Sequence, residues 1–97
     1  MNSEYRVVSA KTIMNARNIE IRWNGWLFDI VYWQRENNWF LAIPNHQISC
    51  VICSPTDTVY NLSKIFRELN NVGMAKVISQ AIKEDYEEWR KENESKN

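Results

Sequence analysis

The residues that could do chemistry in this chain lie between His46 and Asp57, where Cys50 and Cys53 have the C-x-x-C spacing. Thiolate, imidazole and carboxylate groups bind zinc when a tight turn brings both sulfurs to the same ion. The two residues between these cysteines are instead β-branched and extend a predicted strand, in which the sulfurs point to opposite faces. The sequence therefore predicts two buried structural thiols, with no bound metal and no cofactor.

His46 is the only histidine and is the main candidate for acid–base catalysis. A catalytic histidine needs an orienting carboxylate and a nucleophile or water within reach. Ser49 and Asp57 are conceivable partners, but no nucleophile elbow, oxyanion-hole motif or glycine-rich phosphate loop accompanies them. We therefore expect a protein that is not an enzyme. A small metal-binding or enzymatic domain around His46, Cys50 and Cys53 is the alternative.

The elements that would position these groups begin with a run of short apolar stretches from Ile19 to Cys53. Asn24-Gly25 between two such stretches is a strong hairpin signal, because a type I′ turn needs positive φ at both central positions. Four antiparallel strands are predicted: Ile19–Trp23, Trp26–Trp33, Trp39–Ile43 and Gln47–Cys53. Residues 5–18 combine strand-like alternation with helical spacing, which predicts a short first strand or extended arm that runs into one or two helical turns.

The loops between these strands also predict their register. The turn at Asn24-Gly25, a loop at Gln34–Asn37 and a third loop at Pro44–Gln47 give three sets of opposed residues. Examples are Trp23 with Trp26, Tyr32 with Trp39, and Ile43 with Ile48. Directly opposed residues point to the same face. One face of the sheet is therefore almost wholly large and apolar, including Trp23, Trp26 and Trp39, and must be covered.

Two helices after the sheet supply that cover. Ser54 as N-cap, Pro55 at the first helical position and Asp57 at the third predict the start of the first helix. Its apolar stripe is Val59, Leu62, Ile65, Phe66 and Leu69, and Asn70-Asn71 with Gly73 predict its end. The second helix has an apolar face made of Met74, Val77, Ile78, Ala81, Ile82, Tyr86 and Trp89.

These elements predict a single α+β domain over residues 1–97. Its parts are a short irregular or helical N-terminal arm (1–18), a four-stranded antiparallel meander (19–53), two C-terminal helices packed on one face (54–90), and a frayed tail (91–97). The carboxylate run on the second helix, Glu84, Asp85, Glu87 and Glu88, has the pattern of a solvated face.

The opposite face of the sheet is more apolar than a solvated face should be. In the predicted register Val31, Phe40 and Val51 lie side by side, and Trp33 lies near Phe40. The candidate partner-binding residues are Arg22, Val31, Trp33, Arg35, Phe40 and Val51. The N-terminal segment, a second copy of the chain or a partner is expected to cover this face.

Charge narrows the choice of partner. Twelve basic residues balance twelve acidic ones, and the pI is about 6.6. A protein held on nucleic acid by phosphate contacts is markedly basic, so the composition argues against nucleic acid and favours a protein partner. A single-stranded nucleic-acid binder that stacks bases on the sheet aromatics is kept as an alternative. The apolar runs are too short to span a membrane, and the two cysteines indicate reduced thiols in the cytoplasm.

The segment Trp39–Cys50, followed by Asp57–Asn61, resembles a family of small uncharacterised proteins. They are encoded on phages and integrative mobile elements of Gram-positive bacteria and classed as a domain of unknown function. The resemblance covers the second half of the sheet and both helices, and includes no catalytic motif. It implies a host-directed accessory role, since small proteins of mobile elements often inhibit a host defence or polymerase complex, as anti-CRISPR proteins do.

We therefore expect a non-enzymatic protein-binding module of a phage or mobile element, with a host protein or protein complex as its partner. An anti-CRISPR-like inhibitor of a bacterial defence complex fits this description. A homodimer through the same sheet face would bury the apolar residues without a foreign partner.

Overall fold

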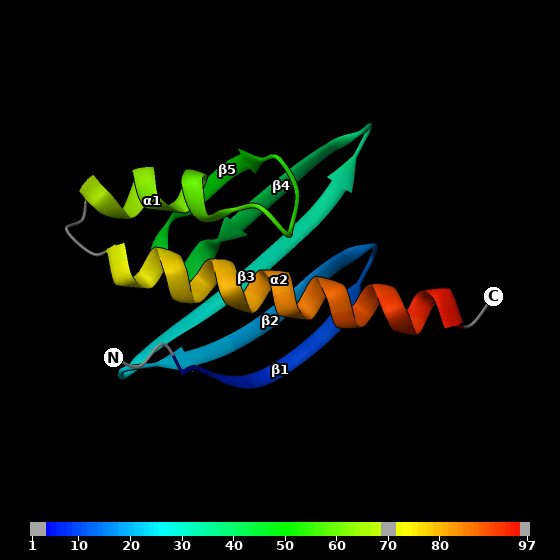
Figure 1. Cartoon of the computed structure of the whole chain (residues 1–97), viewed down its shortest axis with the longest axis horizontal. Coiled ribbons are helices and arrows are strands. Elements are labelled where there is room, and N and C mark those ends of the chain that lie inside the picture. The colour runs from blue at the N-terminus through cyan, green and yellow to red at the C-terminus, as the bar shows by residue number, and fades with distance from the viewer. Residues whose placement is uncertain (1–3, 69–71, 96–97) are drawn as a thin grey trace.

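The computed structural model describes residues 4–68 and 72–95, and in these the chain forms a five-stranded antiparallel sheet with two helices on one face (Figure 1). The strand order is β1-β2-β3-β4-β5, so each strand pairs with its neighbour in sequence. The elements are β1 (Arg6–Ile13), β2 (Ala16–Trp23), β3 (Trp26–Arg35), β4 (Asn38–Ile43), the 3₁₀ turn η1 (Pro44–His46), β5 (Ile48–Ile52), α1 (Val59–Glu68) and α2 (Val72–Ser95). The α+β class with a C-terminal helix pair agrees with the sequence prediction.

The first three hairpins share one turn geometry. Both loop residues have positive φ at Met14-Asn15 (50° and 69°), at Asn24-Gly25 (50° and 81°) and at Glu36-Asn37 (51° and 71°). This is the type I′ conformation, whose twist matches that of the flanking strands. Glycine occupies only one of these six positions, and asparagine, which enters the left-handed region more readily than most residues, occupies three. The turns of the meander therefore depend on asparagine at least as much as on glycine.

In the N-terminal segment the predicted short first strand is present, whereas the predicted helical turns and irregular arm are wrong. Residues 6–13 form β1 with no helical turn, and β2 begins at Ala16 rather than at Ile19. The hairpin between them turns at Met14-Asn15, which lacks the glycine that marks the next hairpin. A β-bulge between Val7 and Ser9 interrupts the pairing of β1 with β2. The sheet therefore has one strand more than predicted.

The predicted register is correct at two hairpins and wrong at one. Trp23 pairs with Trp26, and Ile43 with Ile48, as predicted. Tyr32 pairs with Leu41 rather than with Trp39, because the loop has two residues instead of four. A shift of two residues keeps every side chain on its face, so the assignment of faces holds although the neighbours change.

The helices cover one face and build the core. In Figure 1 α2 runs across the middle of the sheet, α1 lies on the β5 side, and β1 emerges beyond α2. Core residues of the sheet are Ile19, Ile21, Phe28, Ile30, Tyr32, Leu41, Ile43, Ile48 and Ile52, and those of the helices are Leu62, Phe66, Met74, Ala75, Val77, Ile78, Ala81 and Ile82. Trp26, predicted in this core, is instead 45% exposed, because it lies directly after the turn at the margin of the sheet.

The helix boundaries differ from those predicted. α1 begins at Val59 and not at Ser54-Pro55, because residues 54–57 close a turn in which the Asp57 amide donates to the Ser54 carbonyl (3.1 Å). Thr58 instead precedes the helix: its carbonyl accepts from the Leu62 amide, and its buried hydroxyl donates to Ser79 Oγ on α2 (2.8 Å).

The far ends of both helices also differ. Gly73 lies inside α2 rather than ending a helix, and α2 continues to Ser95, through most of the predicted frayed tail. Leu69 and the predicted stop at Asn70-Asn71 lie outside the described residues.

Candidate functional site

The face of the sheet away from the helices has one apolar residue from every strand in a single line. The printed pairs are Ile13 with Ala16, Ala16 with Trp33, Trp33 with Phe40, and Phe40 with Val51. We call these five residues the apolar row. Strands lie about 4.8 Å apart, so the apolar row crosses the full width of the sheet over about 19 Å.

The centre of the apolar row is an aromatic pair. The rings of Trp33 and Phe40 stack with centroids 5.5 Å apart and planes 17° apart. Val51 beside them is 56% exposed, and Ile13 at the other end is 44% exposed. Neither helix lies over this face, and the N-terminal segment, which the sequence offered as a cover, is β1 at the edge of the same sheet. The apolar row is therefore accessible within the described chain.

The chemistry of this face changes along the strands. The row next to the apolar row contains both polar and apolar residues: Lys11, Asn18, Val31, Ala42 and Ser49. The row beyond it is acidic, with Glu20 opposite Asp29. The last row, at the far end of the strands, has Arg6 opposite Arg22. Arg35, opposite Asn38, flanks the apolar row on its other side. This gradient sets an apolar strip beside a polar one, as at a protein interface with an apolar core and a polar rim.

The structure brings most of the predicted partner-binding residues together. Trp33, Phe40 and Val51 are neighbours, Val31 lies opposite Ala42 in the adjacent row, and Arg35 is nearby. Arg22 is separated from the apolar row by six positions of β2, or about 20 Å, and lies at the far end of the face.

Sequence reasoning missed two members of the apolar row, Ile13 and Ala16. These two residues lie on either side of the turn at Met14-Asn15. They would have been found only by reading that dipeptide as a type I′ turn.

The side chain of His46 contacts the start of β3. Its Nε2 lies 3.0 Å from the carbonyl oxygen of Leu27, to which an Nε2–H donates, and its ring packs 4.7 Å from that of Phe28. Asn45 donates to the same carbonyl (2.9 Å) and accepts from the Asp29 amide (3.2 Å). The side chain of Asn45 thus satisfies a backbone donor and acceptor of β3 beyond the part of β3 that pairs with β4. The Pro44–His46 turn therefore holds the N-terminal end of β3 in place.

The two cysteines lie in different environments, and the prediction that both are buried is wrong for Cys53. Cys50 lies opposite Leu41 on the helix side and is half-buried, whereas Cys53 is exposed beyond β5. Burial raises the pKa of the Cys50 thiol, which makes it less reactive. Among residues 4–68 and 72–95 no group of three His, Cys, Asp or Glu side chains is arranged to hold a metal ion.

A polar cluster lies under α2, on the covered side of the sheet. Asp85 accepts from Arg17 Nη2 (2.6 Å) and Nε (3.0 Å) and from the Tyr32 hydroxyl (2.6 Å). These hydrogen bonds raise the pKa of Arg17, and burial together with the hydrogen bond to Asp85 raises the pKa of Tyr32. Arg17 also donates to Thr12 on β1 (3.0 Å). The cluster ties α2 to the first three strands, so Asp85 departs from the solvated face predicted for its carboxylate run.

Comparison with known proteins gives one match, to a protein family. The profile of one protein family matches residues 3–89, which include every strand, α1 and most of α2. This chain is a member of DUF6618, a family of unknown function. The DUF6618 match confirms the expectation of an uncharacterised family and extends over β1, which the resemblance of the sequence segments did not reach. No curated protein and no solved structure gives a significant match.

Neither described helix could cross a bilayer. The longer one, α2, carries too many charged residues for that.

Proposed function

We propose that this member of DUF6618 is a non-enzymatic protein-binding module whose contact surface is the apolar row together with Val31, Ala42 and Arg35. The observation that carries the proposal is the apolar row itself: one apolar side chain from each strand, on a face that neither helix covers. Contiguous exposed apolar surface of this kind marks interaction sites on soluble domains.

The residue types favour a protein over a nucleic acid. Tryptophan and other aromatics supply much of the binding energy at protein interfaces, because they bury a large area at a small cost in rotamer entropy. A base-stacking platform needs cations around its rings. Near the stacked pair the sheet offers Arg35 and, across the mixed row, Lys11, while the chain as a whole is neutral.

We further propose a host protein or complex as the partner and the cytoplasm as the setting. The segments that resemble proteins of phages and integrative elements support a host-directed role, and inhibition of a bacterial defence complex, as by anti-CRISPR proteins, is the form of it that we propose. Two unpaired thiols support a reducing compartment.

The test compares the protein with a Trp33→Ala/Phe40→Ala variant in affinity capture from a bacterial lysate, quantified by mass spectrometry. The wild type should retain a set of proteins that the variant loses. Tyr60→Ala is the matched control, because Tyr60 is a 67%-exposed aromatic on α1, away from the sheet face, and it should retain the set. Recovery of the same proteins by all three forms would show that this face is not the contact surface.

Two further measurements separate the competing occupants. Light scattering of the purified protein would give twice the monomer mass if a second copy covers the face. The second measurement is binding of labelled single-stranded nucleic acid at low ionic strength. Salt-sensitive binding that is lost in the Trp33→Ala/Phe40→Ala variant would show that the partner is a nucleic acid and not a protein.

A further inference from the structure

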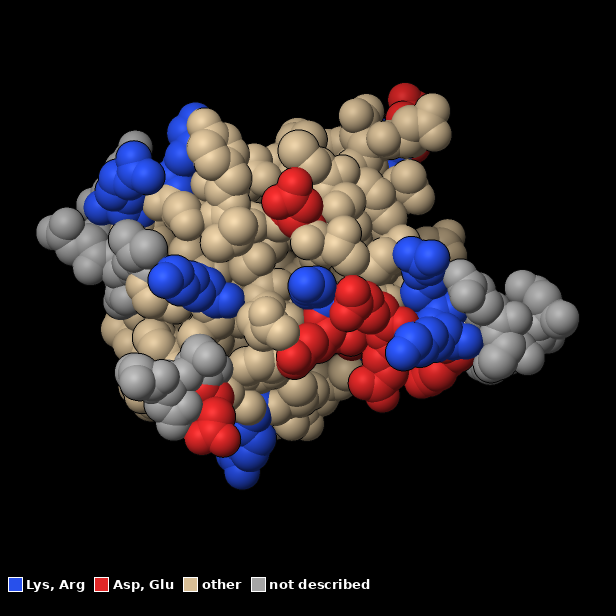
Figure 2. All heavy atoms as spheres, viewed as in Figure 1, with Lys and Arg blue, Asp and Glu red and all other residues tan. Residues whose placement is uncertain are grey.

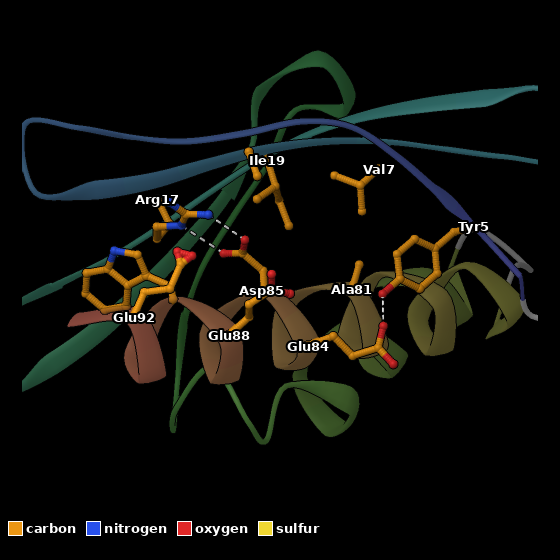
Figure 3. Close-up of a pocket in the computed structure, with 11 residues that line it drawn as sticks. Tyr5, Val7, Arg17, Ile19, Ala81, Glu84, Asp85, Glu88 and Glu92 are labelled. Atoms are coloured by element: carbon orange, nitrogen blue, oxygen red, sulfur yellow. Dashed lines mark hydrogen bonds and ion pairs between the residues drawn. The ribbon is translucent and has the colours of Figure 1, made fainter. Parts of the chain in front are cut away.

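Strand β1 is an edge of the sheet, and a groove runs beside it. In the part of the chain that the structure describes, β1 pairs with β2 alone, and all eight of its residues are exposed. The groove is a cavity of about 480 Å³ between the β1–β2 hairpin and the second half of α2, on the side of the sheet away from the apolar row (Figure 3). Its apolar and aromatic lining is Tyr5, Val7, Ala10, Ile19, Ala81 and Trp89. Arg17 and Asp85 also line it and form an ion pair with each other.

The groove exists because two helices do not cover five strands. α2 packs against β2, and β1 emerges beyond it. Val7, Ala10 and Thr12 of β1 pair with residues that point under the helices, and all three side chains are small. Val7 is 52% exposed. Figure 3 shows Tyr5 reaching from the strand side to Glu84 on α2. The inner side of β1 is therefore a shallow floor on which larger side chains could pack.

The backbone of β1 offers hydrogen bonds on its outer edge. In a hairpin with a two-residue turn the residues next to the turn form a hydrogen-bonded pair, and bonded and non-bonded pairs then alternate. Counting back from the turn that follows Ile13, Ile13 and Lys11 are in bonded pairs with β2. Ala10 and Thr12 are in non-bonded pairs, so their N–H and C=O groups point away from β2. Edge groups of this kind are a template for another strand.

The side of β1 away from the groove is basic. Arg6 and Lys11 are the charged residues of β1, and they point to the open face because they lie opposite Arg22 and Asn18. Opposite charges directly across two strands attract each other, and like charges repel. A strand next to β1 is therefore favoured when it has an acidic residue across from Lys11.

The groove has the reverse preference. Glu84 and Glu88 of α2 are exposed along its helix side, and Figure 2 shows acidic side chains gathered over the C-terminal half of α2. The floor beneath them is apolar, with Val7, Ala10 and Ile19. A residue that points into the groove is therefore favoured when it is apolar and disfavoured when it is acidic.

We infer that β1 takes up an extended segment of a partner protein as a sixth, antiparallel strand, the binding mode called β-augmentation. The segment pairs with the open N–H and C=O groups of Ala10 and Thr12. It has apolar residues across from these two positions, with their side chains in the groove, and an acidic residue between them across from Lys11. Because strands lie about 4.8 Å apart, the apolar side chains lie beside those of β1, next to α2.

The charge on β1 disfavours a second copy of the chain as this strand. Self-pairing that uses both open positions of both copies places Ala10 across from Thr12 and Lys11 across from Lys11 of the second copy. Two like charges then meet directly, and the small inner side chains of a second β1 leave the groove unfilled. The β-bulge between Val7 and Ser9 also shortens the regular edge that another β1 could use.

The experiment measures the fluorescence anisotropy of a labelled peptide, Ser-Leu-Glu-Ile-Thr-Leu-Ser, at increasing concentrations of the protein. This peptide should bind with a Kd below about 1 mM. Its isomer Ser-Leu-Ile-Glu-Thr-Leu-Ser, which turns the acid into the groove and one apolar residue out of it, should bind about tenfold more weakly. Amide hydrogen exchange at Ala10 and Thr12 should become slower when the first peptide is bound. Absence of binding, equal affinity for the two isomers, or unchanged exchange at these two amides would overturn the inference.

Proline variants test which edge is used. Ala10→Pro removes an N–H that points away from β2, a position at which edge strands tolerate proline, and it should abolish binding of the peptide. Ser49→Pro is the matched control, because the same count from the turn at Glu36-Asn37 directs the N–H of Ser49 to the free edge of β5. It should leave binding unchanged. Full binding by Ala10→Pro would show that β1 does not pair with the peptide.

A charge exchange at Lys11 tests the register and does not depend on the folding of a proline variant. Lys11→Glu should weaken binding of the peptide about three- to tenfold. The same variant should bind more tightly a peptide that has lysine in place of the glutamate. If Lys11→Glu keeps the preference of the wild type for the acidic peptide, the proposed register is wrong.

Two controls separate this inference from the other occupants and from the proposed contact face. A dimer in light scattering that becomes a monomer in Ala10→Pro would mean that a second copy pairs with β1, and would overturn the inference. Trp33→Ala/Phe40→Ala changes the other side of the sheet and should leave the affinity for the peptide unchanged. Failure of the apolar row as a contact surface and failure of β1 as a pairing edge are therefore distinguishable.

Discussion

The two faces of the same sheet differ in what lies over them rather than in how their residues alternate. On β3, Phe28, Ile30 and Tyr32 point under the helices and are at most 1% exposed, whereas Val31 and Trp33, which alternate with them, point to the open face. The covered face holds the core, and the open face holds the apolar row. Apolar residues of similar size therefore build the core on one side of the sheet and remain accessible on the other.

The faces also differ in how polar groups are treated. On the covered side Arg17 and Tyr32 converge on one carboxylate of α2, because a polar group enclosed by apolar neighbours needs a partner. On the open side charged residues form their own rows, where water can solvate them. Four predictions use this difference.

The largest expected effect separates two phenylalanines. Phe28→Ala should lower the free energy of unfolding by about 3–5 kcal/mol, because it leaves a cavity in the core. Phe40→Ala should lower it by about 1 kcal/mol, since it removes one aromatic contact on an open face. Urea denaturation measures both, and Phe28→Leu replaces the alanine variant if that does not fold. Equal losses would mean that something encloses the open face.

The second prediction concerns the polar cluster on the covered face. Asp85→Asn should destabilise the protein by about 2–3 kcal/mol, because it leaves Arg17 without a counter-charge at a largely buried position. Glu87→Gln, the control on the exposed side of the same helix, should stay within about 0.5 kcal/mol of the wild type. Similar values for the two variants, measured by the same denaturation, would show that the cluster does not hold α2 to the sheet.

The third prediction concerns the margin of the sheet. Asn45→Ala should destabilise the protein by about 1–2 kcal/mol, because it leaves the Asp29 amide without its partner and removes one donor to the Leu27 carbonyl. Asn38→Ala, at an exposed position of β4, is the control and should cost less. Amide hydrogen exchange at Asp29 should become faster in Asn45→Ala alone.

The smallest effect is a dependence on alkaline pH. The pKa of Tyr32 is raised in the folded protein above its ordinary value of 10.0. The neutral phenol is therefore favoured by folding, and its contribution to stability is complete below pH 10 and is lost as the pH rises above it. One such group changes the free energy of unfolding by at most about 1.4 kcal/mol per pH unit. Tyr32→Phe should reduce the slope of stability against pH above 10. An unchanged slope would assign the dependence to other groups, of which Tyr5 is the first to test.

Much of the fold was predictable because local signals agreed with tertiary packing. The Asn24-Gly25 turn and the alternation on both sides of it place Ile21 opposite Phe28 without reference to any other part of the chain. Strand β1, for which the sequence left both a strand and a helical arm open, shows where local signals become insufficient. Tyr5–Ser9 alternates like a strand, but Ala10, Ile13 and Met14 also fit a helix, and only pairing with β2 decides between them.

The candidate site was predictable to the same degree. Trp33, Phe40 and Val51 were assigned to the open face from the period of two alone, which survives an error of two residues in the register. Their true neighbours, Ala16 and Ile13, required the N-terminal hairpin. The cavity beside α2 could not be foreseen, because it joins Tyr5 to Glu84, residues far apart in sequence that only the packed structure brings together.

The sequence by itself determined the alternation, most of the turns and the two amphipathic helices, and with them the α+β class, because each of these depends on neighbours within a few positions. The tertiary structure decided which strand is the edge, which carboxylates face the sheet and where the helix layer stops short of β1. Those features depend on the area of the sheet that the two helices can cover. This area is a property of the packed structure, and no local sequence pattern encodes it.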